Sequence, residues 1–139
     1  MTDETQFDIS DYEDVTACEV VIKHPVTGAP TDLVITVAGP EHPDRRRINF
    51  ERQRQMRKAL QRTGKLQLAD PVEDEDADTE MLVACTLGWR GMMLGGVPLE
   101  FSKEQARRVY TDAKRRWLRD QVKTAMEERE AFIARSARN

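Results

Sequence analysis

The stretch that decides the fold is WRGMMLGGVPLEFSKEQ, which runs from Trp89 to Gln105. Its glycines and its proline interrupt any helix, so they mark where one helix stops, where the chain reverses and where the next helix begins. Ser102 and Gln105 have the spacing of a capping box, in which the serine side chain accepts the backbone N–H of the third helical residue and the glutamine side chain reaches back. The stretch contains no catalytic set of residues. We expect an acidic arm, a hairpin and a basic helix before it, and helices after it.

The composition predicts one soluble domain. A chain of 139 residues, with 39% apolar and 34% charged residues, is typical of a helix-rich protein with a modest core. Cys18 and Cys85 lie in apolar runs far apart in the sequence, which favours two reduced, buried thiols over a disulfide. The first residues lack the features of a secretory signal, and no apolar run reaches membrane-spanning length, so we expect an intracellular protein.

Charge is distributed in blocks along the chain. Residues 1–22 carry seven acids and no base, residues 41–65 carry nine bases and three acids, and residues 70–80 carry seven acids and no base. Residues 100–139 carry eleven bases and seven acids. Alternating blocks of this kind predict contacts between segments, or between copies of the chain, more than a single nucleic-acid-binding face.

The N-terminal part predicts an arm followed by a β-hairpin. Residues 1–14 are acidic and lack periodicity, so they predict a flexible arm. Residues 15–23 and 33–38 are apolar and β-branched, and the Gly- and Pro-containing segment between them predicts a hairpin over 15–38. His24 and His42 each precede a proline and lie near no cysteine cluster, which favours loop histidines over metal ligands.

A basic helix is predicted over residues 44–63, terminated by Gly64. Its narrow stripe consists of Ile48, Arg52, Met56, Ala59 and Leu60. Its other faces are rich in arginine, and two interpretations remain open for them. In the first interpretation, the arginines contact nucleic-acid phosphates. In the second, they form a solvated face that meets acidic segments. The second is favoured because no aromatic stacking platform is evident beside the charge.

The rest of the domain is predicted to be an acidic connector and helices. Residues 67–78 form the connector, and the helical C-terminal part covers 79–134, with Met81, Leu82, Cys85 and Leu87 buried in its first helix. Further helices are expected from Ser102 to about Ala113 and from about Lys114 to Ala134. The buried residues of these two helices are predicted to be Ala106, Val109, Tyr110, Ala113, Trp117, Leu118 and Val122. The fold class is therefore α+β and predominantly helical, with residues 15–139 as a single domain in which an N-terminal β-hairpin precedes about four helices.

No pattern in the sequence indicates catalysis. Nucleophile motifs, phosphate-binding loops and metal-ligand spacings are missing, and the carboxylates cluster in polar blocks rather than in apolar surroundings that would shift their pKa. We therefore expect a protein that is not an enzyme and that holds no cofactor and no metal.

The order of several short patterns resembles that of the tail assembly chaperones of long-tailed bacteriophages and related prophages, small proteins encoded beside the tape-measure gene. The patterns are Pro25-Val26-Thr27-Gly28 before a strand, Ala38-Gly39-Pro40 before the basic helix, Gly88-Trp89-Arg90-Gly91, the run from Gly96 to Ala106, and Trp117-Leu118-Arg119-Asp120-Gln121-Val122 leading to Phe132. The likeness covers roughly residues 20–133. The acidic arm and the acidic run at residues 73–78 have no counterpart in it.

This resemblance implies a cytoplasmic protein of the bacterial host cell that binds the tape-measure protein and keeps its long apolar helices soluble during tail assembly. It is also compatible with a homo-oligomer and with a longer frameshifted form, which the sequence itself does not show. Under this interpretation the expected partner-binding residues are Met92, Met93 and Leu94 at the tip of the turn, with Phe132 and Ile133 near the end of the chain. Methionine adapts to varied apolar surfaces. The alternative, that these residues fill the protein's own core, remains open.

Two other functions remain in competition. One is a structural tail or connector protein that stays in the virion, where the hairpin and the arm make permanent contacts. The other is a nucleic-acid-binding regulator that uses the helix over residues 45–62, although an isoelectric point near 5.5 argues against it.

Overall fold

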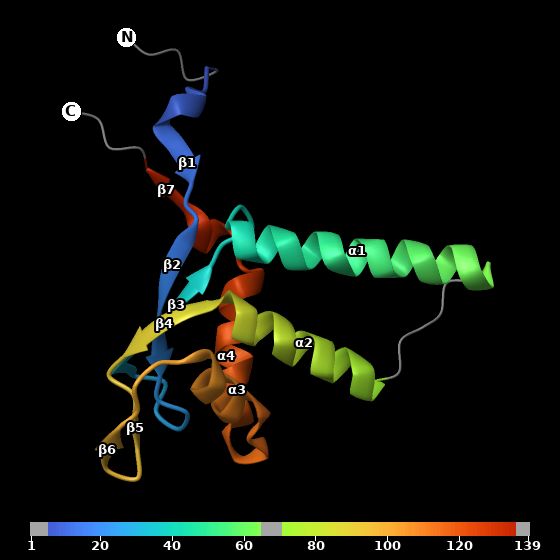
Figure 1. Ribbon diagram of the computed structural model, residues 1–139. Coiled ribbons are helices and arrows are strands. Elements are labelled where there is room, and N and C mark those ends of the chain that lie inside the picture. Colours follow the sequence, from blue (N-terminus) through green and yellow to red (C-terminus); the bar gives the residue numbers. More distant parts are fainter. Residues whose placement is uncertain (1–5, 65–70, 136–139) are drawn as a thin grey trace.

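The computed structural model describes residues 6–64 and 71–135, and it has a mixed α+β fold (Figure 1). Its helices are η1 (Ile9–Asp11), α1 (Pro43–Thr63), α2 (Pro71–Cys85), α3 (Lys103–Thr111), η2 (Ala113–Arg115), α4 (Arg116–Glu127) and η3 (Arg129–Phe132), where η marks a 3₁₀ helix. Its strands are β1 (Tyr12–Asp14), β2 (Ala17–Lys23), β3 (Pro30–Ala38), β4 (Thr86–Arg90), β5 (Met93–Leu94), β6 (Val97–Pro98) and β7 (Ile133–Arg135).

The main sheet has three antiparallel strands with β3 in the centre, between β2 and β4. The predicted hairpin is confirmed as β2 and β3, with Val20 paired to Ile35. The prediction of a helix that still includes Leu87 is wrong, because the chain leaves α2 at Cys85 and enters β4 without a loop. β4 has only five residues, with an aromatic side chain at Trp89, and its pairing with β3 satisfies the backbone groups on the side that faces β3.

Helices α2, α3 and α4 lie on one side of this sheet and form the core with it (Figure 1). From the sheet, Ile22, Ile35 and Val37 are almost completely buried. The helices contribute apolar side chains spaced by three and four residues, which places them on one helical face: Leu82 and Cys85 from α2, Ala106, Val109 and Tyr110 from α3, and Leu118, Val122 and Met126 from α4.

The predicted cap of α3 is confirmed in one of its two hydrogen bonds. The Gln105 backbone N–H donates to Ser102 Oγ at 3.1 Å. The reciprocal bond is not formed, since Gln105 Oε1 is buried without a hydrogen-bond partner. The predicted burial of Ala113 and Trp117 is wrong: Ala113 is exposed in η2, and Trp117 lies on the outer face of α4 with 39% of its surface exposed.

Lys103 stabilises the junction between α2 and β4. Its Nζ donates to the carbonyl oxygens of Val83 and Ala84, both at 3.0 Å, and of Thr86 at 2.7 Å. The last carbonyls of a helix have no intrahelical donor and carry partial negative charge, so an ammonium group is a favourable partner for them. Lys103, the first residue of α3, therefore stabilises the C-terminal end of α2.

The acidic connector predicted over residues 67–78 is wrong from residue 71 onward, since these residues are the first half of α2; residues 67–70 lie outside the described residues. Basic side chains of other helices pair with α2. Glu75 pairs with Arg116 and Arg119, Asp78 pairs with Lys123 at 2.9 Å, and Glu80 pairs with Arg107. Partners that are distant in the sequence thus offset the acidic charge of this helix.

α1 ends as predicted, because Gly64 adopts a left-handed conformation (φ 66°) and its N–H donates to the Leu60 carbonyl. Of the predicted stripe, Ile48, Arg52 and Ala59 are half-buried, whereas Met56 and Leu60 are exposed. His42 is the N-cap, with its Nδ1 accepting the Asp44 N–H at 3.1 Å. Beyond its first turns α1 diverges from the body of the molecule (Figure 1).

The two ends of the described chain form a second, two-stranded sheet of β1 and β7, here named the β1–β7 ribbon (Figure 1). Two predictions are corrected here. Residues 9–14 of the acidic arm have regular structure, and the last helix ends at Glu127 rather than near Ala134. The Val15 N–H donates to the Phe132 carbonyl at 2.7 Å, which joins the ribbon to the main sheet.

Phe132 fills the space where the β1–β7 ribbon, the β2–β3 hairpin and α1 meet. It is 1% exposed, and the Arg45 guanidinium lies 5.9 Å from the centre of its ring. Arg45 also donates to the carbonyls of Ala38 and Met126. A Cβ at Gly39 would lie 2.8 Å from the Phe132 ring and 2.9 Å from the Val15 carbonyl oxygen, so only glycine fits there.

Phe132→Ala is expected to lower the free energy of unfolding by about 3–5 kcal/mol, because it removes a buried aromatic side chain and leaves a cavity. The matched control is Ile133→Ala, which alters an exposed neighbour and is expected to cost less than about 1 kcal/mol. Urea denaturation followed by tryptophan fluorescence measures both. Equal effects of the two variants would contradict the assignment of Phe132 to the core.

A buried polar pair predicts a loss of stability at alkaline pH. Thr86 Oγ1 donates to the Leu82 carbonyl at 2.7 Å, so the Tyr110 hydroxyl donates in its 2.8 Å contact with Thr86. Burial raises the pKa of Tyr110 to about 12, whereas in the unfolded chain it is about 10. The folded state therefore favours the protonated form, and its contribution is complete below pH ~10 and lost as the pH rises toward ~12.

The measurement is urea denaturation of the natural chain and of Tyr110→Phe at about pH 8, 10 and 11. The difference in unfolding free energy between the two proteins isolates Tyr110, because the other titrating groups are common to both. This difference is expected to shrink with rising pH. A difference independent of pH would show that Tyr110 does not contribute in this way.

Candidate protein-binding surfaces

The first candidate surface is the hairpin of β5 and β6. Met93 pairs with Pro98 and Leu94 with Val97, and the turn between them consists of Gly95 and Gly96, with φ of 60° and 79°. Positive φ at both turn positions is the geometry of a tight two-residue hairpin, which glycine adopts without strain. The turn therefore presents two apolar pairs at the end of a short projection.

The base of this hairpin is fixed to the sheet. The Leu99 N–H donates to the Met92 carbonyl, and Trp89 Nε1 donates to the Leu99 carbonyl at 2.8 Å. The Trp89 and Phe101 rings meet edge to face at 4.9 Å. At Gly91 (φ 78°) a Cβ would lie 2.2 Å from the Asp32 carbonyl oxygen, so the close approach of the two backbones requires glycine. Backbone and aromatic contacts thus determine where the hairpin points.

The residues predicted to bind a partner do not lie together. Met92 is 8% exposed and Phe132 is 1% exposed, so both belong to the core, and the interpretation of these two as surface residues is corrected. Successive residues of a strand point to opposite faces, and this places Met93 outward, with 57% of its surface exposed. Leu94 is half-buried, and Ile133 is exposed on the β1–β7 ribbon, remote in the sequence from the hairpin.

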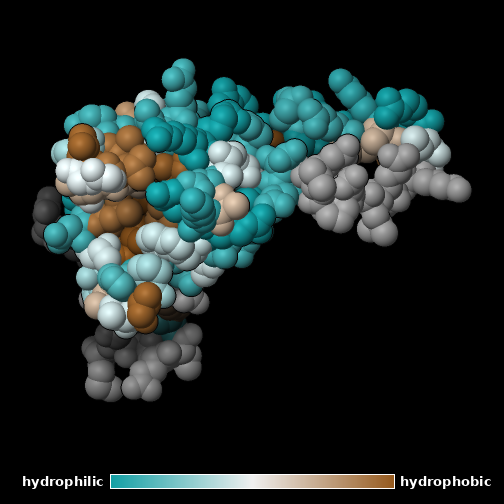
Figure 2. Space-filling model, turned by 90° about the horizontal axis from the view of Figure 1, so that it is seen from below, coloured by the Kyte–Doolittle hydropathy of each residue, from teal (hydrophilic) through white to brown (hydrophobic). Residues whose placement is uncertain are grey.

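Val97, which was not among the predicted partner-binding residues, is 63% exposed at the tip of the hairpin. Seen from below, apolar surface gathers on the side of the molecule where the hairpin lies in Figure 1, whereas the surface toward α1 and α2 is mostly hydrophilic (Figure 2). Isolated apolar side chains on a surface need no explanation, but a gathered patch of them marks an interaction site. Met93 and Val97 are the most exposed apolar residues of the hairpin.

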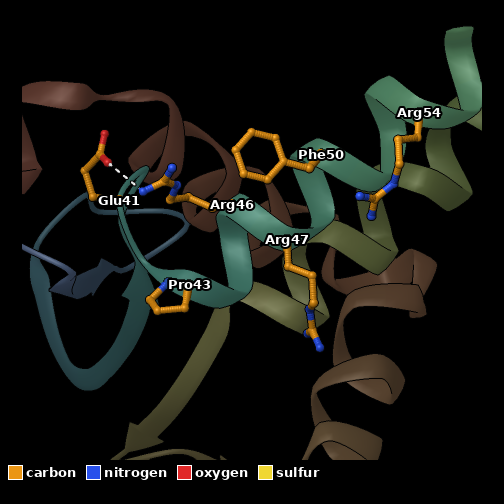
Figure 3. Close-up of a pocket in the computed structure, with 6 residues that line it drawn as sticks. All are labelled: Glu41, Pro43, Arg46, Arg47, Phe50 and Arg54. Atoms are coloured by element: carbon orange, nitrogen blue, oxygen red, sulfur yellow. Dashed lines mark ion pairs between the residues drawn. The ribbon is translucent and has the colours of Figure 1, made fainter.

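The second candidate surface is a shallow groove of roughly 400 Å³ on the outer face of α1, here named the α1 groove (Figure 3). Its lining consists of Glu41, Pro43, Arg46, Arg47, Phe50 and Arg54. Phe50 is 46% exposed in the middle of this lining, and the Arg46 guanidinium lies 5.5 Å from its ring centre. The prediction that no aromatic stacking platform accompanies the basic face overlooked Phe50. The spacing of Phe50 from Arg46, Arg47, Arg54 and Arg57 by three, four and seven residues was the available signal.

The arginines of the α1 groove are paired with carboxylates of the same segment. Arg46 lies 3.8 Å from Glu41, Arg47 lies 3.8 Å from Asp44, and Arg54 lies 2.7 Å from Glu51. Exposed pairs of this kind contribute little to stability. The α1 groove therefore has an apolar floor, and its rim carries both arginine and carboxylate side chains. Residues 41–64 carry eight bases and three acids, so this rim belongs to a segment with an excess of positive charge.

The cysteine and histidine side chains of the described residues show no arrangement for binding a metal ion. Within residues 6–64 and 71–135, no group of three or more His, Cys, Asp and Glu side chains is arranged to hold a metal ion. Cys18 and Cys85 are free thiols, and burial raises the pKa of both. His24 lies in the turn between β2 and β3, where its Nδ1 accepts hydrogen bonds from the backbone N–H groups of Val26 and Thr27.

None of the helices in the described part of the chain has both the length and the apolar character needed to span a lipid bilayer.

Comparison of this chain with family models, curated proteins and solved structures gives no match. Its surfaces are therefore the observations from which its function is inferred.

Substitution of the neighbouring residues Met92 and Met93 tests the assignment of Met92 to the core and of Met93 to the surface. Met92→Ser is expected to lower the free energy of unfolding by about 2–5 kcal/mol, because it removes buried apolar volume. Met93→Ser, made at the neighbouring exposed position, is expected to change it by less than about 1 kcal/mol. Chemical denaturation measures both, and a larger loss for Met93→Ser would reverse the assignment.

Proposed function

We propose that this protein is a tail assembly chaperone of a long-tailed bacteriophage or prophage, which acts in the host cytoplasm by binding the tape-measure protein and keeping it soluble. The observation that carries the proposal is the β5–β6 hairpin, where Met93 and Val97 are exposed on a rigidly anchored projection. The order of sequence patterns from Pro25 to Phe132 supports the same interpretation.

The mechanism is transient coverage of apolar surface and requires no catalytic group. An unbranched, polarisable methionine side chain adapts to the irregular faces of different helices. Two small glycines in the turn leave space around the tip, since nothing lies within 4 Å of a Cβ built at Gly95 or Gly96. A helix that approaches the tip meets Met93 on one face of the hairpin and Val97 on the other. Because few residues take part, binding by one copy is weak and reversible, as a chaperone that leaves its client requires.

The first experiment is coexpression of this chain with the tape-measure protein from the same genome. A soluble complex, from a tape-measure protein that is insoluble when expressed alone, is the expected result. If the tape-measure protein gains no solubility and this chain is instead found in purified mature particles, the proposal fails, and the chain is a structural component of the tail or connector.

The double variant Met93→Ser/Val97→Ser is expected to reduce recovery of the soluble complex about tenfold, because it removes the apolar tip while the fold remains intact. Met56→Ser is the matched control, since Met56 is 60% exposed on α1, far from the hairpin in the chain. Thermal midpoints of all variants are recorded in parallel. Equal recovery with the hairpin variant and the control would exclude the hairpin as the client-binding surface.

A further inference from the structure

We propose that the outer edge of β2, together with the groove between β2 and α4, binds a short, basic, extended segment of a partner protein, which adds a strand to the main sheet. This goes beyond the proposed function, because it concerns a different surface from the β5–β6 hairpin and a partner in an extended conformation. The groove is here named the β2 groove. Three features point to this occupant: the direction of the backbone groups of β2, an amide that already pairs with this edge, and the acids of α4.

β2 is an outer strand of the main sheet, and within the described residues no strand lies beside its second edge. The Gly39 N–H donates to the Thr16 carbonyl at 2.8 Å, so the carbonyl of Thr16 faces β3. In an antiparallel strand this facing alternates, so the N–H and C=O groups of Glu19 and Val21 face away from β3. No hydrogen bond reaches these groups from another element of the described chain. An edge with such groups is a template for a further strand.

The side-chain amide of Gln121 shows what this edge binds. At Lys23, the next outward-facing residue, Gln121 Oε1 accepts the backbone N–H at 2.8 Å and Gln121 Nε2 donates to the carbonyl at 2.9 Å. A side-chain amide has the donor and the acceptor of a peptide group, so this contact reproduces one hydrogen-bonded pair of an antiparallel ladder. Toward the other end of the strand, the Val15 N–H donates to the Phe132 carbonyl. The edge is therefore open between two closed positions, which suits a short segment.

The β2 groove lies beside this open edge and has a volume of about 460 Å³. Val20 and Ala125 are among the residues that line it, and both are half-buried. Val20 packs against the core, whereas Val21 is 49% exposed on the opposite face of the sheet, because successive side chains of a strand alternate. A small or β-branched apolar side chain of an added strand would lie opposite Val20, on the side of α4.

The acids of α4 specify a basic occupant. Asp120 and Glu128 line the β2 groove and are exposed. The bases of α4 form ion pairs with α2, and within the described residues no ion pair includes Asp120 or Glu128. Lys23 also lines the groove, but the alternation of β2 places its side chain on the other face of the sheet, with that of Val21.

The spacing of these acids matches that of an extended segment. Asp120 and Glu128 are eight residues apart, which is about 12 Å along a helix. Residues i and i+4 of an extended segment share one face and are about 13 Å apart. α4 runs antiparallel to β2, because Gln121 contacts Lys23 whereas Phe132 contacts Val15. A segment with two bases four residues apart and an apolar residue midway therefore places one base near each acid.

A second copy of β2 is a poorer occupant of this edge. Antiparallel pairing of two β2 edges is isologous and relates the copies by a two-fold axis. Both copies of α4 would then lie on the same side of the joined sheet, so that Asp120 and Glu128 of one copy would approach those of the other. Opposed like charges destabilise an interface. A separate basic segment obtains its affinity from the same backbone hydrogen bonds without this repulsion.

The probe is the blocked peptide acetyl-Lys-Thr-Val-Thr-Lys-amide, titrated into the ¹⁵N-labelled natural chain and followed by two-dimensional NMR. Its two threonines would pair with Glu19 and Val21, and its valine would lie opposite Val20. A second peptide carries glutamates in place of the lysines. Two further peptides carry N-methyl groups, one on both threonines and one on the valine. Only the threonine N–H groups face β2, so the valine N-methyl peptide is the matched control.

The protein variant is Asp120→Lys/Glu128→Lys, and its control is Glu100→Lys/Glu104→Lys, which reverses two exposed acids at and before the start of α3. Circular dichroism and the thermal midpoint confirm that both are folded. The N-methyl peptides are measured on the natural chain, so that comparison does not depend on the folding of any variant.

The basic peptide is expected to shift the N–H resonances of Glu19 and Val21 saturably. The glutamate peptide and the threonine N-methyl peptide are expected to bind about tenfold more weakly or less, and the valine N-methyl peptide within about twofold. Asp120→Lys/Glu128→Lys is expected to prefer the glutamate peptide, whereas the control variant keeps the preference of the natural chain.

The absence of saturable shifts at Glu19 and Val21, or equal effects of the two kinds of N-methylation, would overturn the proposal. So would unchanged preference in the Asp120→Lys/Glu128→Lys variant, shifts confined to Met93 and Val97, or a natural chain that dimerises through β2 without peptide. The peptide is measured without the tape-measure protein, and client solubility is measured without the peptide. Failure here is therefore distinct from failure of the proposed function.

Discussion

The pairing of β3 on both of its edges is the constraint on which the rest of this structure depends. β2 reaches one edge through a tight turn, which involves only neighbouring residues. β4 reaches the other edge from about fifty residues further along the chain, with Val34 opposite Arg90 and Val37 opposite Thr86. The pairing of β4 also fixes the position of α2, which ends at the residue before β4, and of the β5–β6 hairpin, which begins three residues after β4 ends. The core and the candidate binding surface therefore follow from one non-local strand pairing.

Long-range electrostatic contacts arrange the helices around that sheet. An isolated segment with the acids of α2 would repel itself, but in the folded chain the basic face of α4 lies along it, with Arg119 buried against Glu75. At the other end of α2, Lys103 neutralises the helix terminus from the first turn of α3. Gln121 of α4 accepts the Lys23 N–H and donates to the Lys23 carbonyl, so it takes the place of a neighbouring strand at the edge of β2. Such contacts also protect the sheet from pairing with other edges.

The parts of the fold that depend on neighbouring residues were predictable from the sequence. Ser102 as an N-cap, Gly64 as the end of α1 and the β2–β3 hairpin all follow from contacts within a few residues. The start of α2 was not predictable in this way, because a run of acids is typical of a loop unless distant bases neutralise it. The burial of Phe132 was not predictable either, because the space that holds its ring exists only where Gly39, Val15 and Arg45 come together in the folded chain.

The candidate surfaces were predictable only in part, for the same reason. Met93 was expected at the tip of the turn and is exposed there, but its neighbour Met92 points inward, and only the strand direction of β5 decides between them. Phe50 was overlooked because the helical stripe was assigned to Ile48, Arg52, Met56, Ala59 and Leu60, on another face of α1. Its spacing from the arginines was a signal in the sequence, but only the structure shows the ring half-exposed among them.

The steric exclusion at Gly91 separates the direction of the β5–β6 hairpin from the identity of its tip. The backbone contact with Asp32 tolerates no side chain, whereas the space around Gly95 and Gly96 is open. The positive φ of Gly95 and Gly96 favours glycine in the turn, but the outward side chains of the tip meet no such steric limit, so Met93 and Val97 can change while the direction of the hairpin stays constant. A change of the exposed surface at this tip therefore needs only one or two codons, and a fluorophore can be attached at position 93 without redesigning the fold.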